Sequence, residues 1–100
     1  MKENFKEQLA EYLAKVKAAS DAEFDKWYPS SVKPTFEAEY LKKWVRVKRL
    51  DPAQGSVFCF VDPETGDLYM PASYKVPAKG IRGNIFSDKF PLVGRDFYRR

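Results

Sequence analysis

Two stretches of the chain combine cations with aromatic rings, the pairing with which proteins hold unpaired nucleic acid. In the first, side chains alternate along an expected strand, so that Trp44, Arg46 and Lys48 share one face. Bases stack on aromatic rings while Lys and Arg neutralise phosphates. This face is therefore a candidate nucleic-acid-binding surface. The alternative is that C-terminal residues cover the face and that its rings belong to the core.

The second stretch runs from Tyr74 to Asn84 and contains two glycines. Its candidate contact residues are Tyr74, Lys75, Lys79 and Arg82. Glycine lets a phosphate approach the backbone, and the cations would neutralise it. The stretch matches neither G-x-x-x-x-G-K-[ST] nor G-x-G-x-x-G. An alternative interpretation is a structural loop in which Ser73 caps a helical turn, while Arg82 and Asn84 hydrogen-bond chain turns.

Two further features of the sequence could carry chemistry. Asp62, Glu64 and Asp67 could together bind a divalent cation, but their spacing is not that of an EF-hand loop. The run Asp-Pro-Glu-Thr-Gly-Asp is fully explained as a hairpin turn, which is the interpretation we favour. Cys59 stands in an apolar run without a cationic neighbour, so we expect a buried, inert thiol.

Composition excludes much chemistry. The chain has 100 residues, one cysteine and no histidine, which rules out an internal disulfide, a Cys/His zinc cluster and a Ser-His-Asp arrangement. We expect no enzyme activity, no metal and no cofactor. Residues 1–40 hold six Lys against eight Asp and Glu, whereas residues 41–100 hold twelve Lys and Arg against six. The second part, at +6, suits a polyanion partner, although an ordinary solubilising surface explains it equally well.

The elements that position these residues can be predicted from patterning. Apolar residues at three- and four-residue steps predict an amphipathic helix over 5–18, with Asn4 and Glu7 as its capping box. Ser20-Asp21-Ala22-Glu23 is a second capping box and predicts a separate short helix from Asp21, ended by Pro29. Residues 1–28 are thus the helical part of a single domain.

Residues 35–70 are predicted to form an antiparallel meander. Strands are expected at 43–50, 56–61 and 68–70, with a weaker one at 35–40, joined by turns at 51–55 and 62–67. Alternation places Val57, Cys59 and Val61 on one face, and Phe58 and Phe60 on the other. The fold class is therefore α+β, with two helices packed on a three- to four-stranded sheet.

Residues 71–100 are predicted to be irregular, because prolines and glycines interrupt them. We expect an ordered coil across the sheet, held by apolar residues. These are Ile81, Ile85, Phe86, Phe90, Leu92, Val93, Phe97 and Tyr98.

The run from Ser56 to Phe86 resembles a group of short, uncharacterised proteins encoded by tailed bacteriophages, including marine ones. The residues that carry the resemblance are Ser56, Asp62, Thr65, Gly66, Asp67, Ala72, Ser73, Tyr74, Lys75, Pro77, Ala78, Lys79, Arg82, Gly83 and Asn84. The resemblance covers roughly residues 35–87. It implies a phage or prophage origin and action in the cytoplasm of an infected bacterium. It implies no activity.

These observations predict a small accessory protein that acts by binding. The leading partner is single-stranded nucleic acid, held by the residues Trp44, Arg46, Lys48, Tyr74, Lys75, Lys79 and Arg82. The alternatives are a module that binds a host or phage protein, and a structural component of the virion. No run approaches the roughly 20 apolar residues of a membrane span. Homodimerisation through an uncovered sheet edge stays open.

Overall fold

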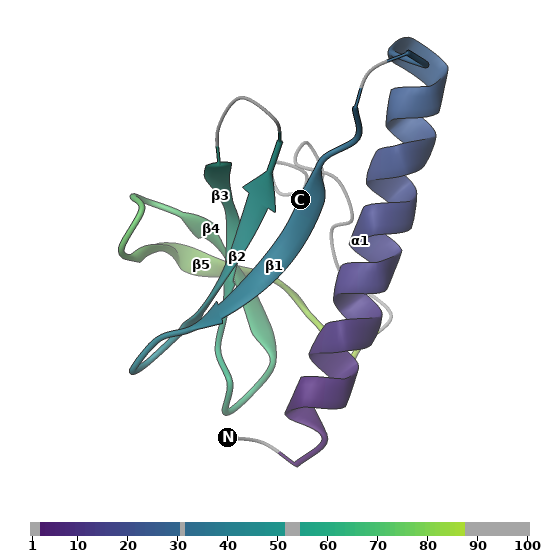
Figure 1. The fold of residues 1–100 in the computed structure, drawn as a ribbon. Helices are drawn as coiled ribbons and strands as arrows, with labels where there is room; N and C mark the ends of the chain where they lie inside the picture. The colour runs from purple at the N-terminus through teal and green to yellow at the C-terminus, as the bar shows by residue number, and fades with distance from the viewer. Residues whose placement is uncertain (1–2, 31, 52–54, 88–100) are drawn as a thin grey trace.

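The computed structural model describes residues 3–30, 32–51 and 55–87, and it shows an α+β fold (Figure 1). One helix, α1 (Phe5–Trp27), precedes five strands. The strands are β1 (Thr35–Tyr40), β2 (Val45–Leu50), β3 (Gly55–Val61), β4 (Asp67–Pro71) and β5 (Pro77–Asn84). They form one sheet in the order β1-β2-β3-β4-β5, each antiparallel to the next. Neighbours in sequence are neighbours in the sheet, so the predicted meander is confirmed.

The prediction of two helices is wrong, because α1 is continuous over 23 residues. No glycine or proline lies between Phe5 and Trp27 to interrupt it. Ser20, the predicted cap, lies within the helix at 8 % exposure. The Lys17 Nζ donates to Asp21 Oδ1 at 2.8 Å, one helical turn later, and so bridges the expected break. Ser20-Asp21-Ala22-Glu23 is therefore helix interior.

The ends of α1 also differ from a simple capping scheme. Asn4 has a positive φ of 64° and its side chain makes no capping hydrogen bond, so the predicted capping box is wrong there. Its backbone carbonyl instead accepts from the Gln8 amide at 3.0 Å. At the other end, Tyr28 leaves helical geometry directly before Pro29, as predicted.

The sheet has five strands rather than three or four, because Pro77–Asn84 pairs with β4. The expected irregular segment is thus wrong over these residues. Pro77 is tolerated because it opens an edge strand, and two register shifts accommodate the extra residues of β5 opposite β4. The predicted C-terminal contacts of Phe90, Leu92, Val93, Phe97 and Tyr98 lie outside the described residues.

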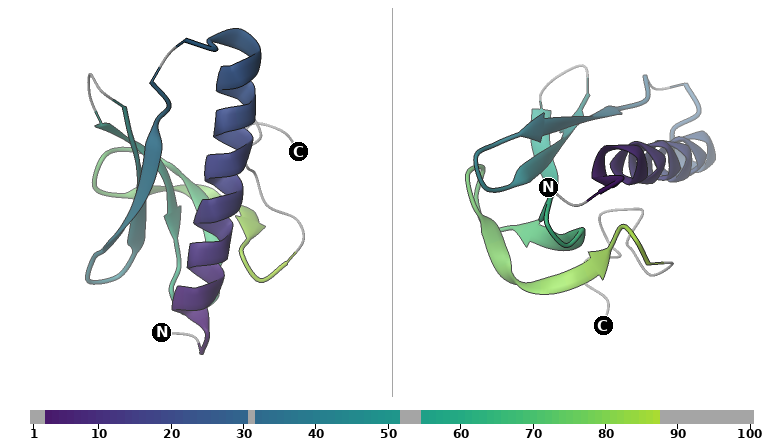
Figure 2. Two further views of the ribbon diagram at one scale, coloured as in Figure 1. Left: turned by 45° about the vertical axis from the view of Figure 1, so that its right-hand side comes forward. Right: turned by 90° about the horizontal axis from the view of Figure 1, so that it is seen from below.

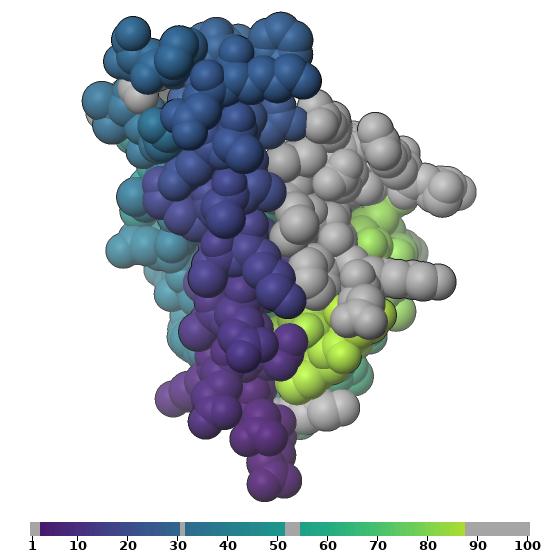
Figure 3. Space-filling view, turned by 90° about the vertical axis from the view of Figure 1, so that its right-hand side faces the viewer, coloured from purple at the N-terminus to yellow at the C-terminus, as the bar shows by residue number. Residues whose placement is uncertain are grey.

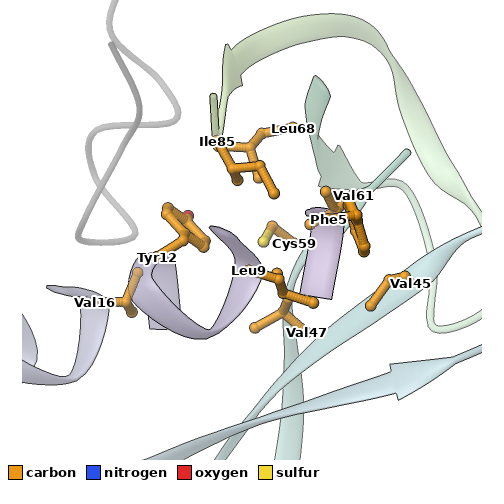
Figure 4. Packing of buried hydrophobic residues seen from close by; sticks show 10 residues of the cluster. All are labelled: Phe5, Leu9, Tyr12, Val16, Val45, Val47, Cys59, Val61, Leu68 and Ile85. Atoms are coloured by element: carbon orange, nitrogen blue, oxygen red, sulfur yellow. The ribbon is translucent and has the colours of Figure 1, made fainter. Parts of the chain in front are cut away.

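Helix α1 packs along one face of the sheet (Figures 1 and 2). The core between them consists of Phe5, Leu9, Tyr12, Val16, Val45, Val47, Cys59, Val61, Leu68 and Ile85 (Figure 4). The Gln8 Nε2 donates to the Ile85 carbonyl at 2.7 Å, and Figure 3 shows the end of the described chain, in yellow-green, directly beside the first turns of α1. The apolar stripe predicted for the helix is confirmed.

A β-bulge alters the predicted faces of β3. Val47 pairs with Cys59, but the next residue, Lys48, pairs with Val57, so Phe58 is the extra residue. Phe58 therefore turns toward α1, packs against the core and lies 5.2 Å from the Phe36 ring, centroid to centroid. The prediction that Phe58 shares a face with Phe60 is wrong for this reason.

The turn between β3 and β4 is confirmed by its hydrogen bonds. The Gly66 amide donates to the Asp62 carbonyl at 2.7 Å, and the Glu64 amide donates to Asp62 Oδ1 at 2.8 Å. Gly66 has a φ of 82°, the left-handed conformation for which glycine is suited. The Asp62 carboxylate thus organises the backbone of this turn.

Candidate functional site

The candidate site lies on the sheet face turned away from α1, here called the second face. Val45 and Val47 point into the core, so Arg46 between them points to the second face. In the register of the sheet, Arg46 lies between Glu39 of β1 and Phe60 of β3. Phe60 is fully buried. The second face is therefore covered at its centre.

Arg46 is the best-connected side chain on this face, although it is only 7 % exposed. Its Nε donates to Glu39 Oε1 at 2.9 Å, and a second nitrogen of the guanidinium pairs with the same oxygen. Its third nitrogen donates to the Tyr74 carbonyl at 2.8 Å. The hydrogen bond and the positive charge of Arg46 lower the pKa of the Glu39 carboxyl below its usual value. Arg46 thus links β1, β2 and the loop after β4.

The loop between β4 and β5 holds Tyr74 over Arg46. The guanidinium carbon lies 4.0 Å from the centroid of the Tyr74 ring, a cation–π contact. The Ser73 hydroxyl accepts from the amides of Lys75 and Val76, both at 3.3 Å. These hydrogen bonds order the loop of a β-hairpin, so the helical turn that one interpretation of the sequence predicted at Ser73 is not formed. Arg46 thus contacts one side of the Tyr74 ring, and the residue remains 54 % exposed.

The hairpin that carries Tyr74 also carries cations and apolar side chains. We call Tyr74, Lys75, Val76, Lys79, Ile81 and Arg82 the hairpin surface. Lys75 and Lys79 are exposed and Arg82 is partly exposed. Within residues 3–30, 32–51 and 55–87, none of the three forms an ion pair with a carboxylate. Their charge is available to a partner.

Gly80 leaves part of this hairpin bare. Its φ is 103°, and a Cβ atom built on it would meet nothing within 4 Å. The register shift between Tyr69 and Pro71 falls at this point, so β5 is irregular where it carries the glycine. A ligand can approach the backbone here, between Lys79 and Ile81.

The other predicted contact residues have partners of their own. Trp44 packs edge to face on Tyr69, with 5.3 Å between ring centroids. The Lys48 ammonium lies 3.9 Å from Glu39 Oε1. Burial, with Asp67 and Asp62 nearby, raises the pKa of the Tyr69 hydroxyl above its usual value. Carboxylates therefore lie near the Trp44 end of the second face, which makes it less suited to phosphate than the hairpin surface.

The structure thus brings Tyr74, Lys75, Lys79 and Arg82 onto one hairpin and places Arg46 beneath it, while Trp44 and Lys48 interact elsewhere. Three further contributors to the site were not predicted from the sequence. Two of them, Val76 and Ile81, are 51 % and 59 % exposed apolar residues. The third is Glu39, which the antiparallel register opposite Arg46 could have indicated.

Asn84 fixes the base of the same hairpin, in line with the structural interpretation of the stretch. Its Nδ2 donates to the Thr65 carbonyl and to Asp67 Oδ1, both at 2.9 Å. Its Oδ1 accepts from the Phe86 amide at 2.7 Å. Asn84 is therefore a structural residue of the strand end.

In the described part of the chain, no three Cys, Asp or Glu side chains come together in a group able to hold a metal ion. None of its helices combines the length and apolar character needed to cross a membrane. The sequence matches "Family of unknown function (DUF7717)" over residues 1–91. Neither the curated proteins nor the solved structures contain a match to it.

Proposed function

Because the chain belongs to the DUF7717 family, whose function is unknown, we propose from the site itself that it binds nucleic acid through the hairpin surface. The observation that carries the proposal is that Lys75, Lys79 and Arg82, which have no carboxylate partners in the described part of the chain, lie on the same hairpin as a half-exposed Tyr74. Cations that are free of internal pairing can each neutralise a phosphate and release a counterion.

The proposal includes the wider setting predicted from the sequence. The protein acts by binding rather than by catalysis, in the cytoplasm of an infected bacterium. The resemblance of residues 56–86 to phage proteins supports that setting. The net charge of +4 and the basic second part of the chain support a polyanion as the partner.

The test is fluorescence anisotropy with a labelled oligonucleotide of about twelve nucleotides, at several salt concentrations. Three phosphate contacts predict that log K falls with log salt with a slope of about −2 for a single strand. Raising salt from about 50 to 200 mM then weakens binding about 20-fold. Charge reversal of Lys75, Lys79 and Arg82 to Glu abolishes binding.

A matched control carries the same change of net charge on the helix. Lys6, Lys15 and Lys26 are exposed residues of α1, and their reversal to Glu leaves most of the affinity in place if the hairpin is the site. Equal loss in both triple variants would mean that only net charge matters. Absence of binding even at low salt would refute the proposal.

A second candidate function is recognition of a host or phage protein. The observation that favours it is the exposure of Val76 and Ile81, because aliphatic side chains are suited to a protein interface rather than to base stacking. Affinity capture from infected cells would then yield one protein in stoichiometric amount. Val76→Ser with Ile81→Ser would lose that protein, whereas the triple charge reversal would reduce its capture only modestly.

A further inference from the structure

Arg46 is buried beneath the hairpin surface, and all three of its nitrogens have acceptors. Two of these nitrogens donate to Glu39 Oε1, and the third donates to the Tyr74 carbonyl. A guanidinium in this state has little surface left with which to meet a phosphate. Its position is nevertheless defined, because a planar fork bound at both ends cannot rotate freely.

The Tyr74 ring rests on this fixed group. One side of the ring contacts the guanidinium at 4.0 Å from the centroid, while more than half of the residue remains open to solvent. The backbone of the same residue is held by the hydrogen bond from Arg46 and by the turn that Ser73 caps. Both the ring and the backbone of Tyr74 are thus held by Arg46.

We propose that the outer side of the Tyr74 ring is the seat of an unpaired nucleobase, and that Arg46 is the residue that positions it. The proposal rests on the proposed function and specifies its ligand as single-stranded nucleic acid. The cations of the hairpin attract any polyanion, whether or not its bases are paired. A flat ring, by contrast, can stack only on a base that has left its duplex.

Preorganisation explains why a Tyr74 ring held by the buried Arg46 should bind a base more tightly than an unsupported Tyr74 ring would. A freely rotating side chain must be immobilised when a ligand binds, and that ordering opposes association. In this structure Arg46 and Glu39 have already restricted the ring. Stacking of one base on such a ring strengthens binding on the order of 10- to 100-fold by alanine-substitution data.

The discriminating probe is an abasic strand, which has the same phosphates and no bases. The wild-type protein should bind a twelve-nucleotide DNA strand at least about 10-fold more tightly than the abasic strand of equal length. Tyr74→Leu should reduce the affinity for the normal strand to that for the abasic strand. Its affinity for the abasic strand and its salt slope should stay unchanged, whereas Tyr74→Phe should behave like the wild type.

Arg46→Met tests the positioning role, because it removes the guanidinium and retains apolar bulk. It should lose the preference for the normal strand while still binding the abasic strand through Lys75, Lys79 and Arg82. Thermal unfolding checks that the variant folds. Should it not fold, Glu39→Gln provides the second test, because it weakens the hold on Arg46 at a more exposed position and should reduce the preference in part.

The two proposals fail differently. Tight, salt-dependent binding that is equal for normal and abasic strands would overturn the stacking proposal and leave the proposed function in place. Absence of binding to either strand would overturn both. A strand preference that survives in Arg46→Met and in Glu39→Gln would overturn the positioning role of Arg46.

Discussion

The strongest prediction about stability concerns Gly66, which lies in the turn between β3 and β4. A Cβ atom at this position would lie 2.7 Å from Cε2 of Phe86 and nearer still to Cδ2, closer than such atoms approach in proteins. The φ of 82° adds backbone strain, since left-handed geometry costs a residue with a side chain about 1–2 kcal/mol. Overpacking against a ring adds about 1–3 kcal/mol. We expect Gly66→Ala to lower the free energy of unfolding by about 2–5 kcal/mol.

The effect is large against the total stability of a domain of this size. About 4–8 °C of Tm is lost for each kcal/mol in a chain of 60–100 residues, so the variant should unfold roughly 8–40 °C below the wild type. Thermal and urea unfolding followed by circular dichroism measure this. Gly80→Ala is the matched control, because its φ of 103° is similarly strained but nothing lies within 4 Å of the new Cβ. Gly80→Ala should lower the free energy of unfolding by about 1–2 kcal/mol.

The steric part of the prediction has its own test in a double variant. Phe86→Ala removes the ring that the new methyl group would meet. Gly66→Ala should therefore cost about 1–3 kcal/mol less in the Phe86→Ala background than in the wild type. Additive effects of the two changes, or equal destabilisation by Gly66→Ala and Gly80→Ala, would refute the argument from packing.

Two other predictions concern α1 and the core. Ser20→Ala should change the free energy of unfolding by less than about 0.5 kcal/mol, because Ser20 is helix interior; a loss of about 1 kcal/mol would indicate an N-cap instead. Cys59 should resist thiol reagents at pH 8 in the native protein and react fully in urea, as mass spectrometry can measure. Burial raises the pKa of its thiol, so the reactive thiolate is scarce, and rapid labelling of the folded protein would contradict this.

The helical part shows what patterning can predict and where it stops. Phe5, Leu9, Tyr12 and Val16 recur at helical spacing, and all four are buried, as expected. The prediction fails at Ser20-Asp21-Ala22-Glu23, where a local capping signal does not begin a new helix. The same four residues are acceptable inside a helix when no Gly or Pro interrupts it and an i, i+4 ion pair crosses the site. Local sequence does not say which outcome prevails.

The sheet could be predicted only where side chains alternate regularly between its two faces. Alternation correctly placed Arg46 on the face opposite to its neighbours Val45 and Val47, but it failed at Phe58 because a bulge adds one residue and reverses the faces beyond it. The strand Pro77–Asn84 was missed for a related reason. Its prolines and glycines are typical of a coil, and its pairing with β4 depends on two further register shifts. Bulges depend on the partner strand and leave little signal in one strand alone.

The same limit explains the outcome for the candidate site. From the sequence, Trp44, Arg46 and Lys48 formed an open cationic face, since the residues that could pair with them lie far along the chain or on another strand. Glu39 pairs with both Arg46 and Lys48, and the loop at Tyr74 lies against Arg46. One carboxylate therefore offsets one of the two positive charges of Arg46 and Lys48. Lys75, Lys79 and Arg82, which have no carboxylate partner within the described residues, lie on the hairpin instead.

Because Arg46 is buried, its role differs from that of an exposed cation. An arginine that is exposed adds charge and attracts any phosphate, whereas an arginine that is buried between Glu39 and Tyr74 adds little field outside the protein but fixes the orientation of a ring. Charge and ring orientation are thus assigned to different residues: Lys75, Lys79 and Arg82 on one side, Arg46 and Tyr74 on the other. Salt weakens the contribution of charge but not that of stacking. The ratio of affinities for normal and abasic strands should therefore stay nearly constant as salt rises. A ratio that falls in parallel with the affinity would mean that the two contributions cannot be separated in this way.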